Sequence, residues 1–194
     1  MSGLTGVTAI SAGDVTAAAI RGDGTVWTWG GNRELQLGSG ATVPFVRVPV
    51  QVSGLAGVTD VSLDFQHGYA VRNDGTVWAW GNNRFGGLGN GVACDWVEGP
   101  ECRSAVPVQV VNLTGAVAVA AMNNAGAAIN NAGAALTDDG QVWVWGANTS
   151  GEFGDPEVDS MEYATEPRLV PGLAGVTGLS DAYFGARALV PDPS

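Results

Sequence analysis

Short runs of β-branched and small apolar residues, separated by glycine-rich turns, recur along the whole chain. The clearest run alternates tryptophan with smaller residues, as DGTVWTWG at 23–30, DGTVWAWG at 74–81 and DGQVWVWG at 139–146. Alternation with a period of two predicts β-strands, and since neither face carries a charge, both faces should be covered. Such a module cannot bury its apolar surface alone, so the copies should stack on one another.

Each repeat holds three further runs that predict strands. The first runs begin at Gly6, Gly57, Gly115 and Gly175, and the second runs end at Ile20, Val71, Leu136 and Leu189. The fourth runs begin at Pro49, Pro107 and Pro167, and a proline at a strand start is tolerated because its missing N–H is not needed there. Asp-Gly dipeptides between the second and third runs predict two-residue hairpin turns, with structural glycines at Gly24, Gly75 and Gly140.

These patterns predict an all-β fold, a β-propeller of four-stranded antiparallel blades, with a sandwich as the less favoured alternative. Three full units and two strands of a fourth give about three and a half blades, a partial ring. The 194 residues would form a single repeat array with approximate units 4–54, 55–112, 113–172 and 173–194. The repeated tryptophans are expected in the core between blades rather than on a carbohydrate platform: Trp27, Trp29, Trp78, Trp80, Trp143 and Trp145.

The charge of the chain limits its partners. Nineteen acidic and eight basic residues give a net charge of -11, which repels phosphate backbones and anionic membrane surfaces. We therefore expect no nucleic-acid partner. No apolar run is long enough for a membrane helix, so no membrane insertion is expected either.

One loop inside the second repeat, before its fourth run, combines two cysteines with an aromatic residue. Cys94 and Cys102 lie close together in ACDWVEGPECR, and a local disulfide would place the protein outside the cell or on its surface. The alternative is a pair of free thiols in the cytoplasm. Because an aromatic side chain on a constrained loop is an effective anchor, this loop is the candidate binding surface. The candidate binding residues are Asn83, Arg84, Asp95, Trp96 and Glu98.

A second loop is rich in carboxylates, and the chain has a single histidine. Asp155, Glu157, Asp159 and Glu162 could offer oxygen ligands to calcium, although a solvated acidic loop is the favoured interpretation. No other cofactor is expected. The single histidine, His67, lies inside a repeat motif, so we expect a structural rather than a catalytic role for it.

The repeated strings resemble the regulator of chromosome condensation family, in a bacterial type of tandem-repeat protein. The family unit reads roughly A-G-x-x-H-x-x-A-L, D-G-x-V-W-x-W-G-x-N, G-Q-L-G and P-x-x-V, and it is matched three times in order. The resemblance implies blades of the seven-bladed propeller type, with His67 at the family histidine and Thr16, Ala132 and Gly185 at the equivalent positions. The family's nucleotide exchange and chromatin binding depend on particular loops and a basic surface that do not map onto this chain.

The resemblance favours a non-enzymatic binding scaffold that recognises a protein, or a glycan, through loops on one face. One alternative is a structural protein that assembles into rings or filaments through its open ends, because uncapped repeat arrays expose apolar faces. Another alternative is a propeller hydrolase or lyase. A homo-oligomer or the remainder of a longer propeller would cover the open ends.

Overall fold

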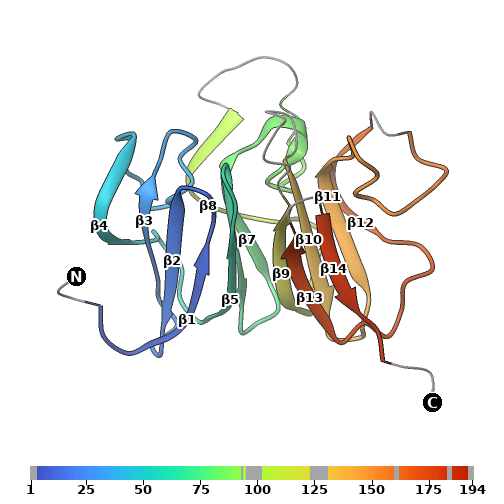
Figure 1. Cartoon of the computed structure of the whole chain (residues 1–194), viewed down its shortest axis with the longest axis horizontal. Coiled ribbons are helices and arrows are strands. Elements are labelled where there is room, and N and C mark those ends of the chain that lie inside the picture. The colour runs from blue at the N-terminus through green and yellow to red at the C-terminus, as the bar shows by residue number, and fades with distance from the viewer. Residues whose placement is uncertain are drawn as a thin grey trace.

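Antiparallel sheets, set side by side, make up the chain (Figure 1). The computed structural model describes residues 4–92, 94, 102–122, 131–159, 162–182 and 185–191. Three sheets have four strands each and the last has two, and within every sheet the strands lie in chain order. None of the described residues form a helix of the length and apolar character needed to cross a membrane.

The first blade contains β1 (Val7–Ala12), β2 (Thr16–Arg21), β3 (Val26–Gly31) and β4 (Phe45–Gln51). The second contains β5 (Val58–Leu63), β6 (His67–Arg72), β7 (Val77–Asn82) and β8 (Arg103–Gln109), with a short 3-10 turn, η1 (Arg84–Gly86), after β7. The third contains β9 (Ala116–Met122), β10 (Ala132–Thr137), β11 (Val142–Ala147) and β12 (Tyr163–Leu169). The last sheet pairs β13 (Gly178–Ala182) with β14 (Gly185–Leu189). The prediction of an all-β array of four-stranded antiparallel blades is confirmed.

The hairpin turns at the Asp-Gly dipeptides are longer than the predicted two-residue turns. In the first blade the amide of Gly24 donates to the carbonyl of Arg21 at 2.8 Å, and the amide of Arg21 donates to the carbonyl of Thr25 at 2.9 Å. Gly24 has a φ of 73°, whereas Asp23 is not among the residues with positive φ. The aspartate instead accepts from the amide and hydroxyl of Thr25, at 3.0 and 2.6 Å. A turn followed by one left-handed glycine therefore replaces the predicted pair of left-handed residues.

The prolines lie within the fourth strands, so the prediction that they open these strands is wrong. Pro49 lies inside β4, which begins at Phe45, and the register between β3 and β4 shifts between Thr28 and Gly30. The fourth strand is the edge of its sheet, where a proline costs no ladder hydrogen bond on its open side. The register shift between β3 and β4 accommodates Pro49, which has no N–H to donate.

Apolar clusters fill the space between neighbouring blades. One cluster joins the first two blades, with Ala18, Val26 and Val52 on one side and Val61 and Ala70 on the other. A second cluster joins the second and third blades, and a third lies between the third blade and the β13–β14 pair. Each blade therefore buries its face only against its neighbour, as a stacked array requires.

The first strands of successive blades are also tied by hydrogen bonds. The hydroxyl of Ser11 accepts from the amide of Leu63 at 3.2 Å, and the hydroxyl of Ser62 accepts from the amide of Ala121 at 3.0 Å. The carboxylate of Asp60 accepts from the amide of Val119 at 2.9 Å. These bonds satisfy backbone groups that would otherwise be unpaired along the innermost strands.

In the second and third blades, the second tryptophan of the third strand points toward the preceding blade. Trp80 is fully buried, and its Nε1 donates across the blade boundary to the carbonyl of Gln36 at 2.8 Å. Trp145 repeats this arrangement with the carbonyl of Gly87 at 3.0 Å. Trp29, which has no blade before it among the described residues, is only half-buried. The first tryptophans are half-buried and stay near the hairpin turns: Trp27, Trp78 and Trp143.

Replacing Trp80 with alanine should lower the free energy of unfolding by about 3 to 5 kcal/mol, because a fully buried indole and its hydrogen bond are both lost. The matched control is Trp29→Ala, which removes the same side chain from the equivalent but half-buried position and should cost less than half as much. Urea unfolding of both variants measures the difference. Equal losses would contradict the assignment of the second tryptophan to the blade boundary.

Candidate functional site

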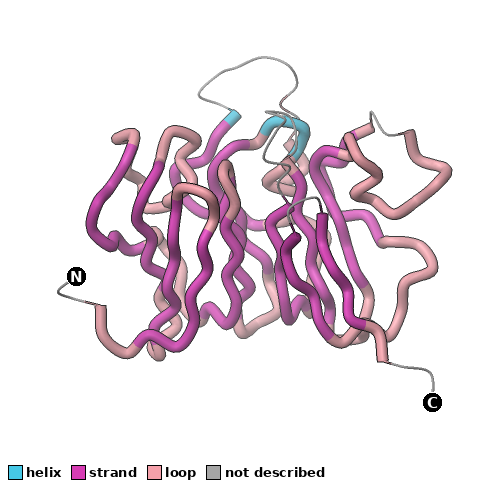
Figure 2. Tube along the Cα trace, viewed as in Figure 1, coloured by secondary structure: helices cyan, strands magenta, loops and turns pink. Residues whose placement is uncertain are grey.

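The three long connections between third and fourth strands gather on one edge of the array. They comprise residues 32–44, 83–102 and 148–162, and we call them together the loop rim. Their described residues lie at the upper edge in Figures 1 and 2, opposite the Asp-Gly hairpin turns. Every blade delivers its longest connection to the same edge because the strand order is the same in each sheet. The sequence and length of the loop rim can therefore vary without disturbing the core of the array.

A buried asparagine anchors the start of each rim connection. Asn32, Asn83 and Asn148 are buried, and their side-chain oxygens accept from the amide five residues later, at 3.1, 3.0 and 3.0 Å. Their side-chain amides donate to carbonyls farther along the same connection: Ala41 and Val43, Val92, and Asp159. In each connection the asparagine side chain thus bonds both the start of the loop and residues farther along it. The conformation in which each loop leaves its sheet is therefore fixed.

The second rim connection contains all five predicted binding residues. Asp95, Trp96 and Glu98 lie outside the described residues. Cys94 and Cys102 are buried and face each other, with Cα atoms 5.5 Å apart, which suits the predicted disulfide. The carbonyls of these two cysteines accept from the amides of Phe85 and Asn83, at 3.1 and 2.7 Å. Both ends of the segment between the cysteines are therefore fixed to the start of the same loop.

The two other predicted binding residues have structural contacts. The side chain of Asn83 is used inside the loop and is 3% exposed, so it is not presented to a partner. Arg84 begins the turn η1, where its amide donates to the side chain of Asn82 at 2.7 Å and its carbonyl accepts from Asn131 at 3.4 Å. Both residues support the loop from below, so contacts with a partner would come from residues nearer its tip.

A buried carboxylate and the single histidine lie beneath the rim, in the second blade. Nδ1 of His67 is 3.0 Å from Oδ2 of Asp64, and both side chains are buried. Oδ1 of Asp64 also accepts from the amides of Gln66 and His67, each at 2.6 Å. In the part of the chain that the structure describes, Nε2 of the histidine has no hydrogen-bond partner, so no nucleophile is placed against it. The aspartate holds a tight turn between β5 and β6, which agrees with the expected structural role of His67.

Buried polar contacts join this region to the blades on either side. The side chain of Asn82 donates to Glu34 at 2.9 Å and accepts from Asn131 at 3.0 Å, so it connects all three full blades. The ring of Tyr69 stacks on His67, and its hydroxyl donates to the carbonyl of Gly87 at 2.6 Å. Burial, with the nearby Asp64 carboxylate, raises the pKa of Tyr69 well above its usual value, so the phenol remains a donor. Sequence reasoning missed Asp64 and Asn131, because Asp64 replaces the motif glycine and Asn131 stands at a variable position of the motif.

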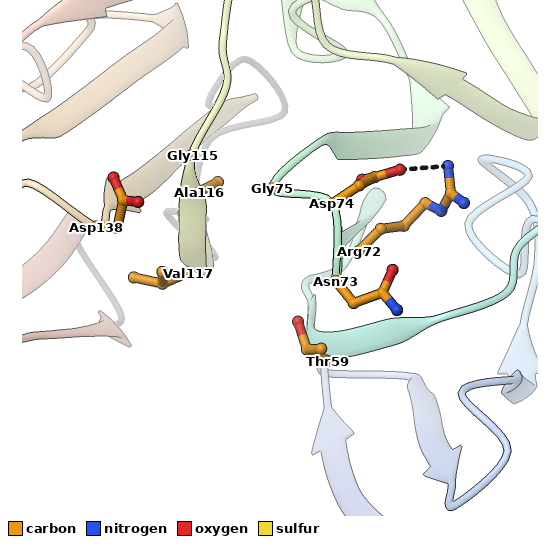
Figure 3. Close-up of a pocket in the computed structure, with 9 residues that line it drawn as sticks. All are labelled: Thr59, Arg72, Asn73, Asp74, Gly75, Gly115, Ala116, Val117 and Asp138. Carbon is orange, nitrogen blue, oxygen red and sulfur yellow. Dashed lines mark ion pairs between the residues drawn. The ribbon is translucent and has the colours of Figure 1, made fainter.

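An open groove lies at the opposite edge, between the hairpin turns of the second and third blades (Figure 3). It has a volume of about 560 Å³ and is lined by Thr59, Arg72, Asn73, Asp74, Gly75, Gly115, Ala116, Val117 and Asp138. Two of its three charged groups are paired with each other, because Nη1 of Arg72 lies 3.0 Å from Oδ2 of Asp74. A hydrogen bond from the hydroxyl of Thr76 lowers the pKa of Asp74, with the amide of Thr76 contributing as well.

The charged pair in this groove is a feature of the repeat. The first blade has the same arrangement, with Arg21 3.3 Å from Asp23 and the pKa of Asp23 lowered by the hydroxyl of Thr25. An ion pair that recurs in the first two hairpins stabilises the turn locally, so it does not single out one ligand site. In the third hairpin Thr137 replaces the arginine, and its hydroxyl donates to Asp139 at 2.6 Å. We therefore place the candidate functional site at the loop rim rather than in the groove.

The acidic loop of the third blade does not bring its carboxylates together. In the described residues no group of three or more His, Cys, Asp or Glu side chains is placed to hold a metal ion, and this includes Asp155, Glu157, Asp159 and Glu162. Asp155 accepts from the amide of Glu157 at 3.0 Å, and Glu162 pairs with Arg168 at 3.2 Å. The structure therefore gives no support to the calcium site.

Comparison with known sequences decides the family of the chain. A model of the regulator of chromosome condensation (RCC1) repeat matches residues 23–71 and 74–129, and a second RCC1 repeat model matches 7–36, 58–86 and 130–152. The chain belongs to the RCC1 repeat family. The E3 ubiquitin-protein ligase HERC2 of Homo sapiens is 30% identical over 169 residues, which cover 86% of this chain and 3% of HERC2.

Solved RCC1-type propellers share the fold. Human WBSCR16 superposes with a TM-score of 0.75 at 20% identity, over 97% of this chain and 46% of that protein. Prp20p of Saccharomyces cerevisiae superposes with a TM-score of 0.75 at 16% identity, over 98% of this chain and 45% of that protein. The RCC1 repeats described here thus span less than half the length of these propellers and a small part of HERC2. The bacterial type of repeat stays a prediction.

Replacing Asn83 with alanine should lower the free energy of unfolding by about 1 to 3 kcal/mol, because the buried amide of Leu88 loses its acceptor. Exchange of the Leu88 amide with deuterium should accelerate more than exchange in β6. The control is Asn73→Ala, which removes the same side chain from an exposed position and should change stability by less than about 0.5 kcal/mol. If both variants unfold alike, Asn83 does not anchor the loop.

Proposed function

We propose that this RCC1-repeat array is a protein-binding scaffold that recognises its partner through the loop rim and catalyses no reaction. The observation that carries the proposal is the anchoring of three long connections on one edge by equivalent buried asparagines. Loops held at their roots by a rigid sheet lose little freedom on binding, which favours affinity.

Exposed apolar side chains on the rim support the proposal. Val43 is 52% exposed in the first connection and Val92 is 49% exposed in the second. Phe45, at the end of the first connection, is 55% exposed and carries the guanidinium of Arg47 over its ring. Apolar side chains bordered by polar loops are typical of protein interfaces.

Relatives support a protein as the partner. The structure of Prp20p was described together with its binding to Gsp1p and histones, so an RCC1-type propeller serves there as a binding protein. The net charge of -11 makes a neutral or basic protein surface the better match for this chain. A glycan is the less favoured ligand, because the tryptophans described in the blades pack between or within the blades and so form no platform for a sugar ring.

Replacing both Val43 and Val92 with aspartate should weaken partner binding at least about tenfold, because two exposed apolar contacts become charged. Partners are first captured with the wild-type chain from an extract and identified by mass spectrometry. Affinity for the purified partner is then measured by calorimetry. Val117→Asp is the matched control, since it is 50% exposed and lies on the groove at the opposite edge. Equal affinity of the rim variant and the wild type would reject the loop rim as the binding site.

We further propose that Cys94 and Cys102 form a disulfide in the functional protein, which then acts outside the cell or at its surface. A cytoplasmic protein with two thiols is the alternative. The two cysteines are eight positions apart, and closing so short a loop stabilises a fold by about 2 to 3 kcal/mol in the chain-entropy model.

Purified without reductant, the chain should resist alkylation at both cysteines in denaturant and should have a mass two hydrogens lower than after reduction. Reduction should lower the melting temperature by several degrees. Cys94→Ser should reproduce the reduced melting temperature and be insensitive to reductant. Two alkylated cysteines in protein taken directly from its native compartment would place the protein in a reducing environment.

Self-assembly through the ends of the array is a second candidate function. Ile10 on β1 is 79% exposed and Leu189 on β14 is 69% exposed, so both end sheets present apolar side chains. Large exposed apolar surfaces favour association. Sedimentation velocity over a wide concentration range tests this function, and a monomer at every concentration would reject it.

A further inference from the structure

In the first two hairpins an arginine binds two acceptors of its own blade. Nε of Arg21 donates to the carbonyl of Thr5 at 3.0 Å, and its Nη1 lies 3.3 Å from Oδ2 of Asp23. Arg72 of the second hairpin makes the equivalent two contacts, each at 3.0 Å. Both arginine side chains are 33% exposed, so the position is partly sheltered from water. The chain thus binds a guanidinium twice, between a main-chain carbonyl and an aspartate.

The third hairpin has both acceptors but no arginine. The carbonyl of Thr114 directly precedes Gly115, just as the carbonyls that bind the two arginines precede the equivalent glycines. Thr137 stands at the arginine position, and its hydroxyl donates to Oδ1 of Asp139 at 2.6 Å. The amide of Gln141 donates to the same oxygen at 3.3 Å. In the part of the chain that the structure describes, Oδ2 of this aspartate, the oxygen that the arginines contact elsewhere, therefore receives no donor.

The main chain around the three positions is the same. The amide that follows the arginine position donates to the carbonyl of the glycine before the first strand, at 2.8, 2.8 and 2.9 Å in the three hairpins. The turn glycines Gly24, Gly75 and Gly140 have φ values of 73°, 75° and 78°. The two acceptors of the third hairpin are therefore held as they are in the hairpins that bind an arginine.

The groove between the second and third hairpins reaches this position (Figure 3). Gly115, next to the Thr114 carbonyl, lines the groove, and so does Asp138. A Cβ atom at Gly115 would lie 3.0 Å from Oδ1 of Asp138, so this carboxylate lies over the glycine. Asp138 faces the Arg72–Asp74 pair across the groove, and no described side chain pairs with it. The wall formed by the third hairpin therefore carries negative charge that the chain does not compensate.

The size and lining of the groove favour a protein segment over a single amino acid. A cavity of about 150 Å³ accepts benzene, so the groove, at about 560 Å³, holds more than one side chain. Ala116 and Val117 give it an apolar part, and Val117 is 50% exposed. The net charge of -11 attracts basic segments from a distance.

We propose that the third hairpin binds the guanidinium of an arginine carried by an extended segment of a partner protein. Nε of that arginine donates to the carbonyl of Thr114 and Nη1 to Oδ2 of Asp139, and the residues beside it lie along the groove against Val117. The planar guanidinium reaches both acceptors at once, whereas an ammonium is a point charge. Asp138 adds a second negative charge that favours a cation. The site lies on the edge opposite the loop rim and does not depend on it.

The test adds the blocked pentapeptide GVRVG to the isotope-labelled chain and follows the backbone amide signals by NMR. A partly exposed ion pair binds weakly, so the method must detect weak binding, and we expect saturable shifts centred on the third hairpin. Glutamine in place of the arginine should abolish saturation, and lysine should weaken binding at least about threefold. Acetylarginine amide, which lacks the flanking residues, should also bind at least about threefold more weakly than the pentapeptide.

Exchanges within the chain test the site itself. Thr137→Arg gives the hairpin its own arginine and should weaken peptide binding at least about tenfold. It should not lower the melting temperature, because two hairpins already fold with an arginine there. Arg72→Thr is the reverse exchange and should open a second peptide site at the second hairpin. Asp139→Asn should weaken binding at least about fivefold, whereas Asp23→Asn, at a carboxylate already paired with Arg21, should leave it unchanged.

Several results would overturn the proposal. They are the absence of saturable shifts, equal binding of the arginine and glutamine peptides, and full binding by the Thr137→Arg chain. Equal binding of acetylarginine amide and the pentapeptide would assign the site to free arginine instead of a protein segment. Concentration-dependent shifts of the chain alone that vanish in the Thr137→Arg chain would assign it to a second copy. None of these results bears on the loop rim, which the Val43 and Val92 substitutions test separately.

Discussion

The contact on which the array depends is the indole that crosses from one blade to the loop of the blade before it. Trp80 and Trp145 each fill a slot that only a glycine floor leaves open, and each donates to a backbone carbonyl there. The contact buries an apolar ring and also satisfies its N–H group, so its loss would remove both the apolar burial and the hydrogen bond. It also fixes the loop that carries the acceptor, because that loop cannot move without exposing the ring.

This coupling explains how a fold with a repetitive core can present a defined binding edge. The acceptor loops are the first turns of the rim connections, and they are closed by Asn32, Asn83 and Asn148. Core packing and loop conformation are thus determined by the same few residues. The buried Asp64–His67 pair and the bridging Asn82 extend the effect across the second blade, where polar groups that are hydrogen-bonded specify one arrangement.

The sequence predicts the blades well because the repeat is local. Alternating residues and Asp-Gly dipeptides place the strands, and three copies in the same order identify the family before any contact is known. The predictions that fail are those that depend on where a residue lies in the tertiary structure. Pro49 is tolerated inside β4 because β4 is an edge strand, and a single-sequence pattern does not show which edge is open. Asp64, the partner of His67, was missed because it replaces the motif glycine, and Asn131, which bonds Asn82, was missed because it stands at a variable position of the motif. The calcium site near Asp155, which the sequence offers only as the less favoured alternative to a solvated acidic loop, gains no support, because the described carboxylates there are not grouped to hold a metal ion.

The direction of the indole contact makes the two ends of the array chemically different. Among the described residues Trp80 and Trp145 each reach back to the blade before, so one side of the array presents the half-buried Trp29 and the other presents the cavity beside Ala186. Two copies of the same end cannot make the indole contact, because a ring would face a ring or a cavity would face a cavity. A symmetric dimer formed by joining the same end of two chains therefore gains nothing from this contact. A contact of this kind between two such arrays would therefore have to be head-to-tail.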